Sequence, residues 1–82
     1  ISAMDAVVDA DVVNGKAENS EIGDNVFIME GAKVKDSTVR NSIIFPNAEI
    51  IDSEIRNSII DRDTDIEDTE LNDAIIGEHT SL

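Results

Sequence analysis

Histidine is the side chain that most often serves as a general base, and this sequence contains one, His79. One histidine does not supply the three nitrogen ligands of a catalytic zinc site, and the absence of cysteine removes thiolate metal sites and disulfides. His79 also shares a repeat position with Gly31, Asn47 and Asp63. Glycine adopts positive φ freely, and Asn, Asp and His are enriched among the exceptions, so a turn role already explains His79. We therefore predict no catalytic residue and no metal ligand here.

Nucleotide or phosphate chemistry would need a glycine-rich loop or a cluster of basic side chains. The sequence has no GxGxxG pattern, no glycine-rich phosphate loop, and no cluster of its few lysines and arginines that could hold a sugar nucleotide. We therefore expect no cofactor-binding residue in this chain.

The charge balance excludes some partners. Nineteen acidic residues against six basic ones give a net charge of −13, which opposes binding to nucleic acid or to an anionic membrane. The excess admits two interpretations: a solvated acidic face, or a halophilic protein in which salt screens the self-repulsion. Asp36, Asp52 and Asp68 share one repeat position and would stack about 4.8 Å apart, so they would need counter-ions.

A repeat must position all of these side chains. Between Ile28 and Ile76 the sequence recurs every 16 residues, and the aliphatic residues within each repeat are spaced six, five and five apart. This spacing fits neither the 3.6-residue period of a helix nor the two-residue period of a long strand. It predicts a chain that turns a corner every five or six residues, in other words a solenoid.

The expected core and domain boundaries follow from this pattern. Small residues at three other repeat positions are expected to line the corners, and Pro46 is expected to lie in a turn because it cannot donate to a strand ladder. We expect an irregular leading segment at residues 1–11 and a β-helix domain of four to five coils at residues 12–82. The side chains predicted to point inward are Val34, Val39, Ile44, Ile50, Ile55, Ile60, Ile66 and Leu71.

A second aliphatic column directly precedes one of the inward positions. Successive side chains of extended backbone point to opposite faces, so this column should point outward. Exposed apolar ladders usually mark contacts with another domain or subunit, and we predict an interface here. Two alternatives stay open: both side chains of each pair are partly buried at a corner, or residues 1–11 fold back over the column. The predicted interface residues are Phe27, Ile43, Ile59 and Ile75.

Several units resemble the hexapeptide repeat, namely IGDNVF, IMEGAK, IFPNAE and IGEHTS. That resemblance implies an all-β protein, a single-stranded left-handed parallel β-helix. More narrowly, VKDSTVRNSIIFPNAEIIDSEIRNSII is similar to the C-terminal domain of sugar-1-phosphate nucleotidyltransferases, especially archaeal enzymes like glucose-1-phosphate thymidylyltransferase. The likeness covers Val12 to Leu82.

The resemblance also implies a division of labour. In such enzymes an upstream domain performs catalysis and binds Mg²⁺, while the β-helix serves oligomer assembly and, in some members, allosteric control. The implied partners are that upstream catalytic domain and further copies of the chain, as a dimer or trimer. The alternative is a hexapeptide-repeat acyltransferase active as a trimer, in which His79 would be the general base. No apolar run approaches the roughly 18 residues of a membrane span and no signal-peptide pattern is seen, so we expect a cytoplasmic protein.

Overall fold

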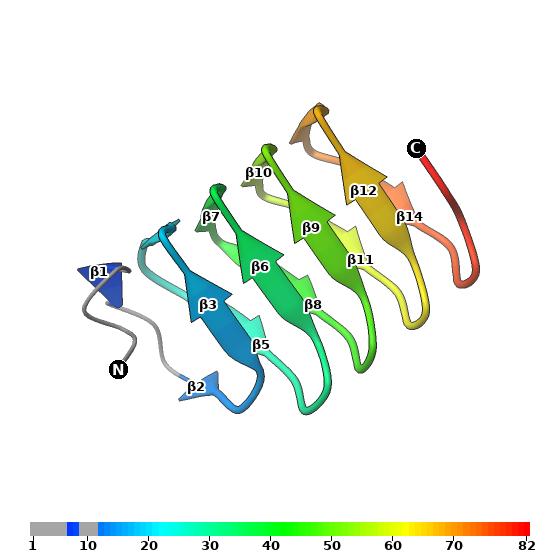
Figure 1. Ribbon diagram of the computed structural model, residues 1–82. Helices are drawn as coiled ribbons and strands as arrows, with labels where there is room; N and C mark the ends of the chain where they lie inside the picture. Colours follow the sequence, from blue (N-terminus) through cyan, green and yellow to red (C-terminus); the bar gives the residue numbers. More distant parts are fainter. Residues whose placement is uncertain (1–6, 9–11) are drawn as a thin grey trace.

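The computed structural model describes residues 7–8 and 12–82, with side chains from Asn14 onward, and it is a stack of coils built from three parallel sheets (Figure 1). Sheet 1 contains β1 (Val7–Val8), β4 (Glu21–Ile22), β7 (Thr38–Arg40), β10 (Glu54–Arg56) and β13 (Glu70–Asn72). Sheet 2 contains β2 (Val12–Val13), β5 (Val26–Ile28), β8 (Ser42–Ile44), β11 (Ile59–Ile60) and β14 (Ile75–Ile76). Sheet 3 contains β3 (Lys16–Glu18), β6 (Lys33–Lys35), β9 (Glu49–Ile51) and β12 (Asp65–Glu67).

Each strand pairs with its counterpart one coil away, as Ile55 does with Val39 on one side and Leu71 on the other. The strands are only two or three residues long, and the described residues include no helix. The predicted parallel β-helix is therefore confirmed. Its stability depends on stacking, because each coil buries its apolar edge against its neighbours.

The interior is a column of aliphatic side chains. Seven of the eight predicted core residues are at most 1% exposed. The prediction for Leu71 is wrong in degree, because this residue is only partly buried. It lies on β13, the last strand of sheet 1, so only one neighbouring strand covers it. The fully buried aliphatic residues are Ile22, Val26, Ile28, Val34, Val39, Ile44, Ile50, Ile55, Ile60 and Ile66.

Residues with positive φ form the corners. The predicted turn column is confirmed, with φ of 84° at Gly31, 65° at Asn47, 54° at Asp63 and 61° at His79. A Cβ on Gly31 would also approach the Asn47 side-chain oxygen, so a larger residue there would require the Asn47 side chain to move. The other corners use the same device, which the sequence analysis did not anticipate. Their positive-φ residues are Asn19, Asn25, Asp36, Asn41, Asp52, Asn57, Asp68 and Asp73.

Small hydroxyl residues satisfy the backbone at two corners. The Ser53 hydroxyl donates a hydrogen bond to the carbonyl oxygen of Ile51 at 2.8 Å and accepts one from the amide of Thr69 at 3.1 Å. Each buried hydroxyl thus joins its own coil to the next, and no buried polar group is left unpaired at these positions. The same pair of bonds recurs at Ser20, Ser37, Ser42 and Ser58.

The start of the chain differs in part from expectation. Within the segment predicted to be irregular, Val7–Val8 forms β1 and pairs in parallel with β4. The rest of that prediction, including the alternative in which the segment folds back over the apolar column, falls on residues 1–6 and 9–11, which lie outside the described residues. Pro46 lies in a turn as expected.

Candidate functional site

The predicted interface residues form a continuous column on the outer face of sheet 2. Strand pairing places Phe27 beside Ile43, Ile43 beside Ile59, and Ile59 beside Ile75. Phe27 and Ile59 are each 37% exposed and Ile75 is 80% exposed, whereas Ile43 is half-buried between its neighbours. We call these four residues the apolar column. Its inward partners Ile28, Ile44 and Ile60 are 0% exposed, so the strand alternation separates core from surface as predicted.

Two further apolar residues widen this surface in the earlier coils. Met29 and Phe45 each follow an inward isoleucine, so by alternation they point to the same side as the apolar column, and both are half-buried. Asp61 and Gly77 take this position in the later coils. The sequence analysis missed Met29 and Phe45, although the 16-residue repeat would have aligned them. The surface is therefore broad and apolar over β5 and β8 and narrower over β11 and β14.

An asparagine row borders the apolar column. A shallow groove lies between the two, lined by Asn25, Asn41 and Asn57 with the hydroxyl residues Ser42 and Ser58 and the column residues beside them. The Asn25 amide nitrogen donates to the Asn41 side-chain oxygen at 3.1 Å. An apolar centre with a polar edge able to hydrogen-bond is the usual anatomy of a protein interface.

His79 lies at a corner and not in a pocket. Its side chain is 69% exposed, and its Nδ1 is 3.9 Å from the nearer Asp63 carboxylate oxygen, too far for a hydrogen bond. Its backbone amide donates to the Arg62 carbonyl oxygen at 3.1 Å, one coil below. Its positive φ and this bond give the residue a structural role. Among the described residues, no three His, Asp or Glu side chains are placed to hold a metal ion.

The stacked carboxylates lie at one corner of sheet 1. Asp36, Asp52 and Asp68 surround a shallow polar hollow with Glu54 and Glu70. The protonated Glu70 carboxyl donates a hydrogen bond to the Glu54 carboxylate, and this bond, together with the repulsion between the two groups when both are ionised, raises the pKa of the Glu70 carboxyl above its usual 4.5. The nearby Arg56 guanidinium opposes the shift; it lies 3.6 Å from the Glu70 carboxylate. The Glu70 carboxyl on this exposed face therefore loses its proton less readily than an isolated glutamate does.

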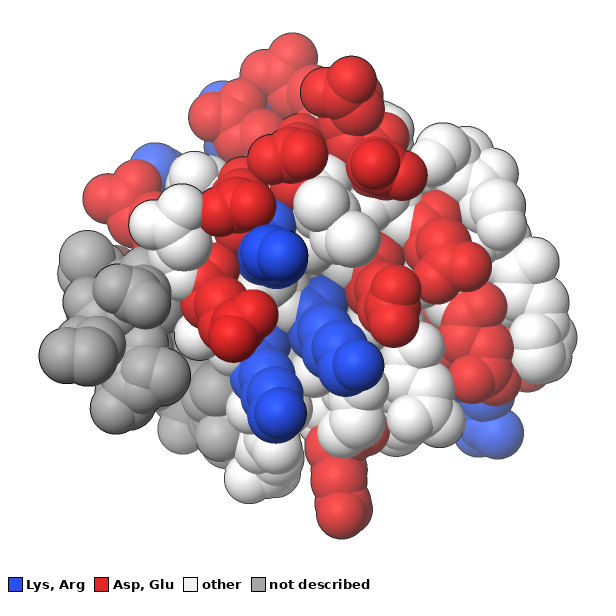
Figure 2. Space-filling model, in the orientation of Figure 1, with Lys and Arg blue, Asp and Glu red and all other residues white. Residues whose placement is uncertain are grey.

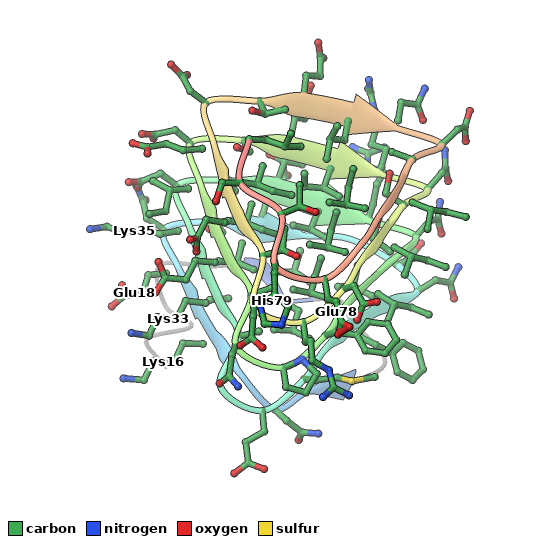
Figure 3. The ribbon with its side chains drawn as sticks, turned by 90° about the vertical axis from the view of Figure 1, so that its right-hand side faces the viewer. Lys16, Glu18, Lys33, Lys35, Glu78 and His79 are labelled. Atoms are coloured by element: carbon green, nitrogen blue, oxygen red, sulfur yellow. The ribbon has the colours of Figure 1, made fainter. Side chains whose placement is uncertain are left out.

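The structure brings together three basic residues that are scattered in the sequence. Lys16 pairs with Lys33, and Lys35 lies on the same strand as Lys33, so all the lysines project from sheet 3. In Figure 3 they point to one side of the coil together with Glu18, away from His79. The sequence analysis did not anticipate this grouping. The lysines stand one coil apart, which a linear search for a basic run does not detect.

A parallel solenoid with three short strands per coil and small residues at the corners is the architecture of a hexapeptide-repeat protein. The family described as GlmU-like, C-terminal hexapeptide matches residues 2–82, and the chain belongs to that family. No curated protein and no solved structure matches the chain. The resemblance to hexapeptide-repeat proteins is thus confirmed. Within the described part of the chain, no helix has the length and hydrophobicity needed to cross a membrane.

Proposed function

We propose that this chain is the non-catalytic assembly and regulatory domain of a sugar-1-phosphate nucleotidyltransferase, of the glucose-1-phosphate thymidylyltransferase type and of archaeal origin. The parent reaction converts a nucleoside triphosphate and a sugar 1-phosphate into an NDP-sugar and pyrophosphate. Membership of a GlmU-like, C-terminal hexapeptide family supports the proposal. The observation that carries it is the apolar column on the outer face of a stiff, ladder-bonded sheet.

The partner on this surface is a second or third copy of the same chain. A rigid face presents its side chains in a fixed arrangement, so little conformational entropy is lost when two such faces meet. Burying one exposed Ile or Phe side chain contributes about 1.5–3 kcal/mol. Two copies bring eight such side chains together, and each is only about half exposed beforehand, so each contributes about half of that value. Their burial then contributes on the order of 6–12 kcal/mol in total. Association costs about 4–15 kcal/mol, which is similar to this gain. A charged substitution in the apolar column should therefore decide whether the copies associate.

The first half of the proposal is that the isolated domain does not catalyse the parent reaction. The purified chain is to be incubated with each nucleoside triphosphate, Mg²⁺ and sugar 1-phosphates, and pyrophosphate release measured. We expect none above the buffer control, because the described residues provide no glycine-rich phosphate cradle or positioned metal ligands. Turnover that copurifies with the folded domain would contradict this half. The assembly half is tested separately, by sedimentation of the native chain and of a variant of the apolar column.

A hexapeptide-repeat acyltransferase active as a trimer is the second candidate function. The observation in its favour is His79, which is exposed and has the Asp63 carboxylate 3.9 Å from its Nδ1. The test measures free thiol released from acyl-CoA in the presence of amine and hydroxyl acceptors. His79→Asn is the matched control, because Asn also accepts the positive φ at this corner. Release by the native chain that this variant abolishes would favour the acyltransferase over the assembly domain.

A further inference from the structure

The outer face of sheet 3 carries charges that are sorted along the solenoid. One column of outward residues runs through Lys16, Lys33, Glu49 and Asp65, and the parallel column runs through Glu18, Lys35, Ile51 and Glu67. Their inward neighbours Ala17, Val34, Ile50 and Ile66 belong to the core or pack against it. Figure 2 looks onto this face, where basic side chains gather over β3 and β6 and acidic ones over β9 and β12.

No lysine on this face forms an ion pair within 4.0 Å in the described part of the chain. The ion contacts found there within 4.0 Å are Arg56 with Glu70 and His79 with Asp63, and neither involves a lysine. The three lysines therefore form a basic region on a protein whose net charge is −13. A face that is positive in one half and negative in the other is complementary to an inverted copy of itself.

We propose that the outer face of sheet 3 is a second self-association surface, on which two copies pack with their solenoid axes antiparallel. The two-fold axis runs along β9. This rotation carries β6 of one copy onto β12 of the other, since β6 and β12 flank β9. Lys33 then lies opposite Asp65 of the second copy, and Lys35 opposite Glu67. Ile51 meets Ile51 of the second copy at the axis and supplies an apolar centre.

Charge selects this orientation over the other two-fold packing of the same face. An axis along the solenoid would place Lys33 opposite Lys35 and Asp65 opposite Glu67, which makes four like pairs in the dimer against two unlike pairs of Lys16 with Glu18. The antiparallel packing forms four unlike pairs in the dimer and one unfavourable meeting, Glu49 with its own copy. That meeting is flanked by lysines one coil away, about 4.8 Å along the sheet.

This surface is independent of the apolar column, which lies on sheet 2. Because the two faces differ, a chain can use both at once. The sheet 3 contact is small and ionic, so it should be weak and should loosen with salt.

Single-cysteine cross-linking tests the geometry directly, because the native chain has no cysteine. Ile51→Cys, treated with a short bis-maleimide, should yield covalent dimer, since stacked sheets lie about 10 Å apart. Glu21→Cys on the outer face of sheet 1 is the matched control and should yield far less. Adding Lys33→Asp to Ile51→Cys should lower the dimer yield several-fold. Equal yields from the two cysteine positions, or no effect of Lys33→Asp, would overturn the proposal.

A charge swap separates this surface from the apolar column. In the Ile43→Lys, Ile59→Lys background, sedimentation at low salt should still show a dimer. Lys33→Asp should then weaken the dimer about tenfold or more, a size typical of a desolvated charge pair. Adding Asp65→Lys should restore it, because the unlike pairs are re-formed with reversed sign. A monomeric background, or a swap that restores nothing, contradicts the sheet 3 contact while leaving the apolar column to its own test. If the background does not fold, the cross-linking result decides.

Discussion

At the scale of single residues, the corners explain much of the unusual composition. In the described part of the chain eleven non-glycine residues have positive φ, and every one of these is Asn, Asp or His. These side chains tolerate the left-handed region better than other L residues do. Asp36, Asp52 and Asp68 are therefore turn residues, with φ of 51°, 51° and 57°. Part of the acidic excess is therefore explained by the positive φ of the corner residues, without a role for the surface charge.

Substitution of Asp52 separates the charge of this residue from its backbone role. Asp52→Asn keeps a side chain suited to φ of 51° and removes one charge from between Asp36 and Asp68. We expect it to raise the free energy of unfolding by a few tenths of a kcal/mol at low salt. Asp52→Val also removes the charge, but its β-branched side chain is strained at positive φ. It should therefore lower the free energy of unfolding by about 1–3 kcal/mol. Urea titration of both variants checks this, and equal stability of the two would contradict the turn role.

Glu70 gives a pH dependence whose sign follows from its pKa. Its pKa is raised in the folded state by the Glu54 hydrogen bond and charge, so the folded chain binds this proton more tightly than the unfolded chain. The free energy of unfolding should therefore fall as pH rises from the ordinary value of 4.5 through the raised pKa. Glu70→Gln should remove this contribution to the pH dependence of the free energy of unfolding. The check is the difference between native and variant stability across that window; a constant difference would contradict the shared proton.

At the scale of elements, the inward and outward positions of one doublet should respond differently. Ile60 is 0% exposed in the core and its neighbour Ile59 is 37% exposed on the outer face. Ile60→Ala should lower the free energy of unfolding of the dissociated chain by about 2–5 kcal/mol, because it leaves a cavity. Ile59→Ala should cost under about 1 kcal/mol. The pair is to be compared by urea unfolding at low protein concentration. Equal losses would mean that the doublet is buried on both sides.

The sequence was sufficient to predict the structure of one coil, but it did not show which side chains of neighbouring coils lie side by side. The 16-residue spacing predicted the strands, the core and one corner column, because aliphatic side chains in a narrow solenoid tolerate few other arrangements. The positive-φ residues at the remaining corners were missed because Asn and Asp there resemble ordinary surface residues until φ is known. Leu71 fits the inward pattern, but the repeat does not show where neighbouring strands stop. The lysine group of sheet 3 appears only when residues one coil apart are placed side by side.

At the scale of the whole molecule, the net charge of −13 opposes the compact state. Salt screens exposed charges beyond about 8 Å at physiological ionic strength and more closely at molar salt. The melting temperature should therefore rise between low salt and molar potassium chloride, measured at a protein concentration where assembly does not change. Sodium sulfate at equal ionic strength would separate screening from general salting-out. A melting temperature indifferent to potassium chloride would remove the proposed halophilic adaptation.

The central claim is that the apolar column joins copies of this chain, and sedimentation equilibrium tests it most directly. The native chain is to be compared with Ile43→Lys, Ile59→Lys in molar salt, where the sheet 3 contact is screened. Circular dichroism must show the same strand signal for both. We predict that the native chain is a dimer or trimer and that the variant is monomeric while folded. A monomeric native chain, or a folded variant that associates equally well, would contradict the claim.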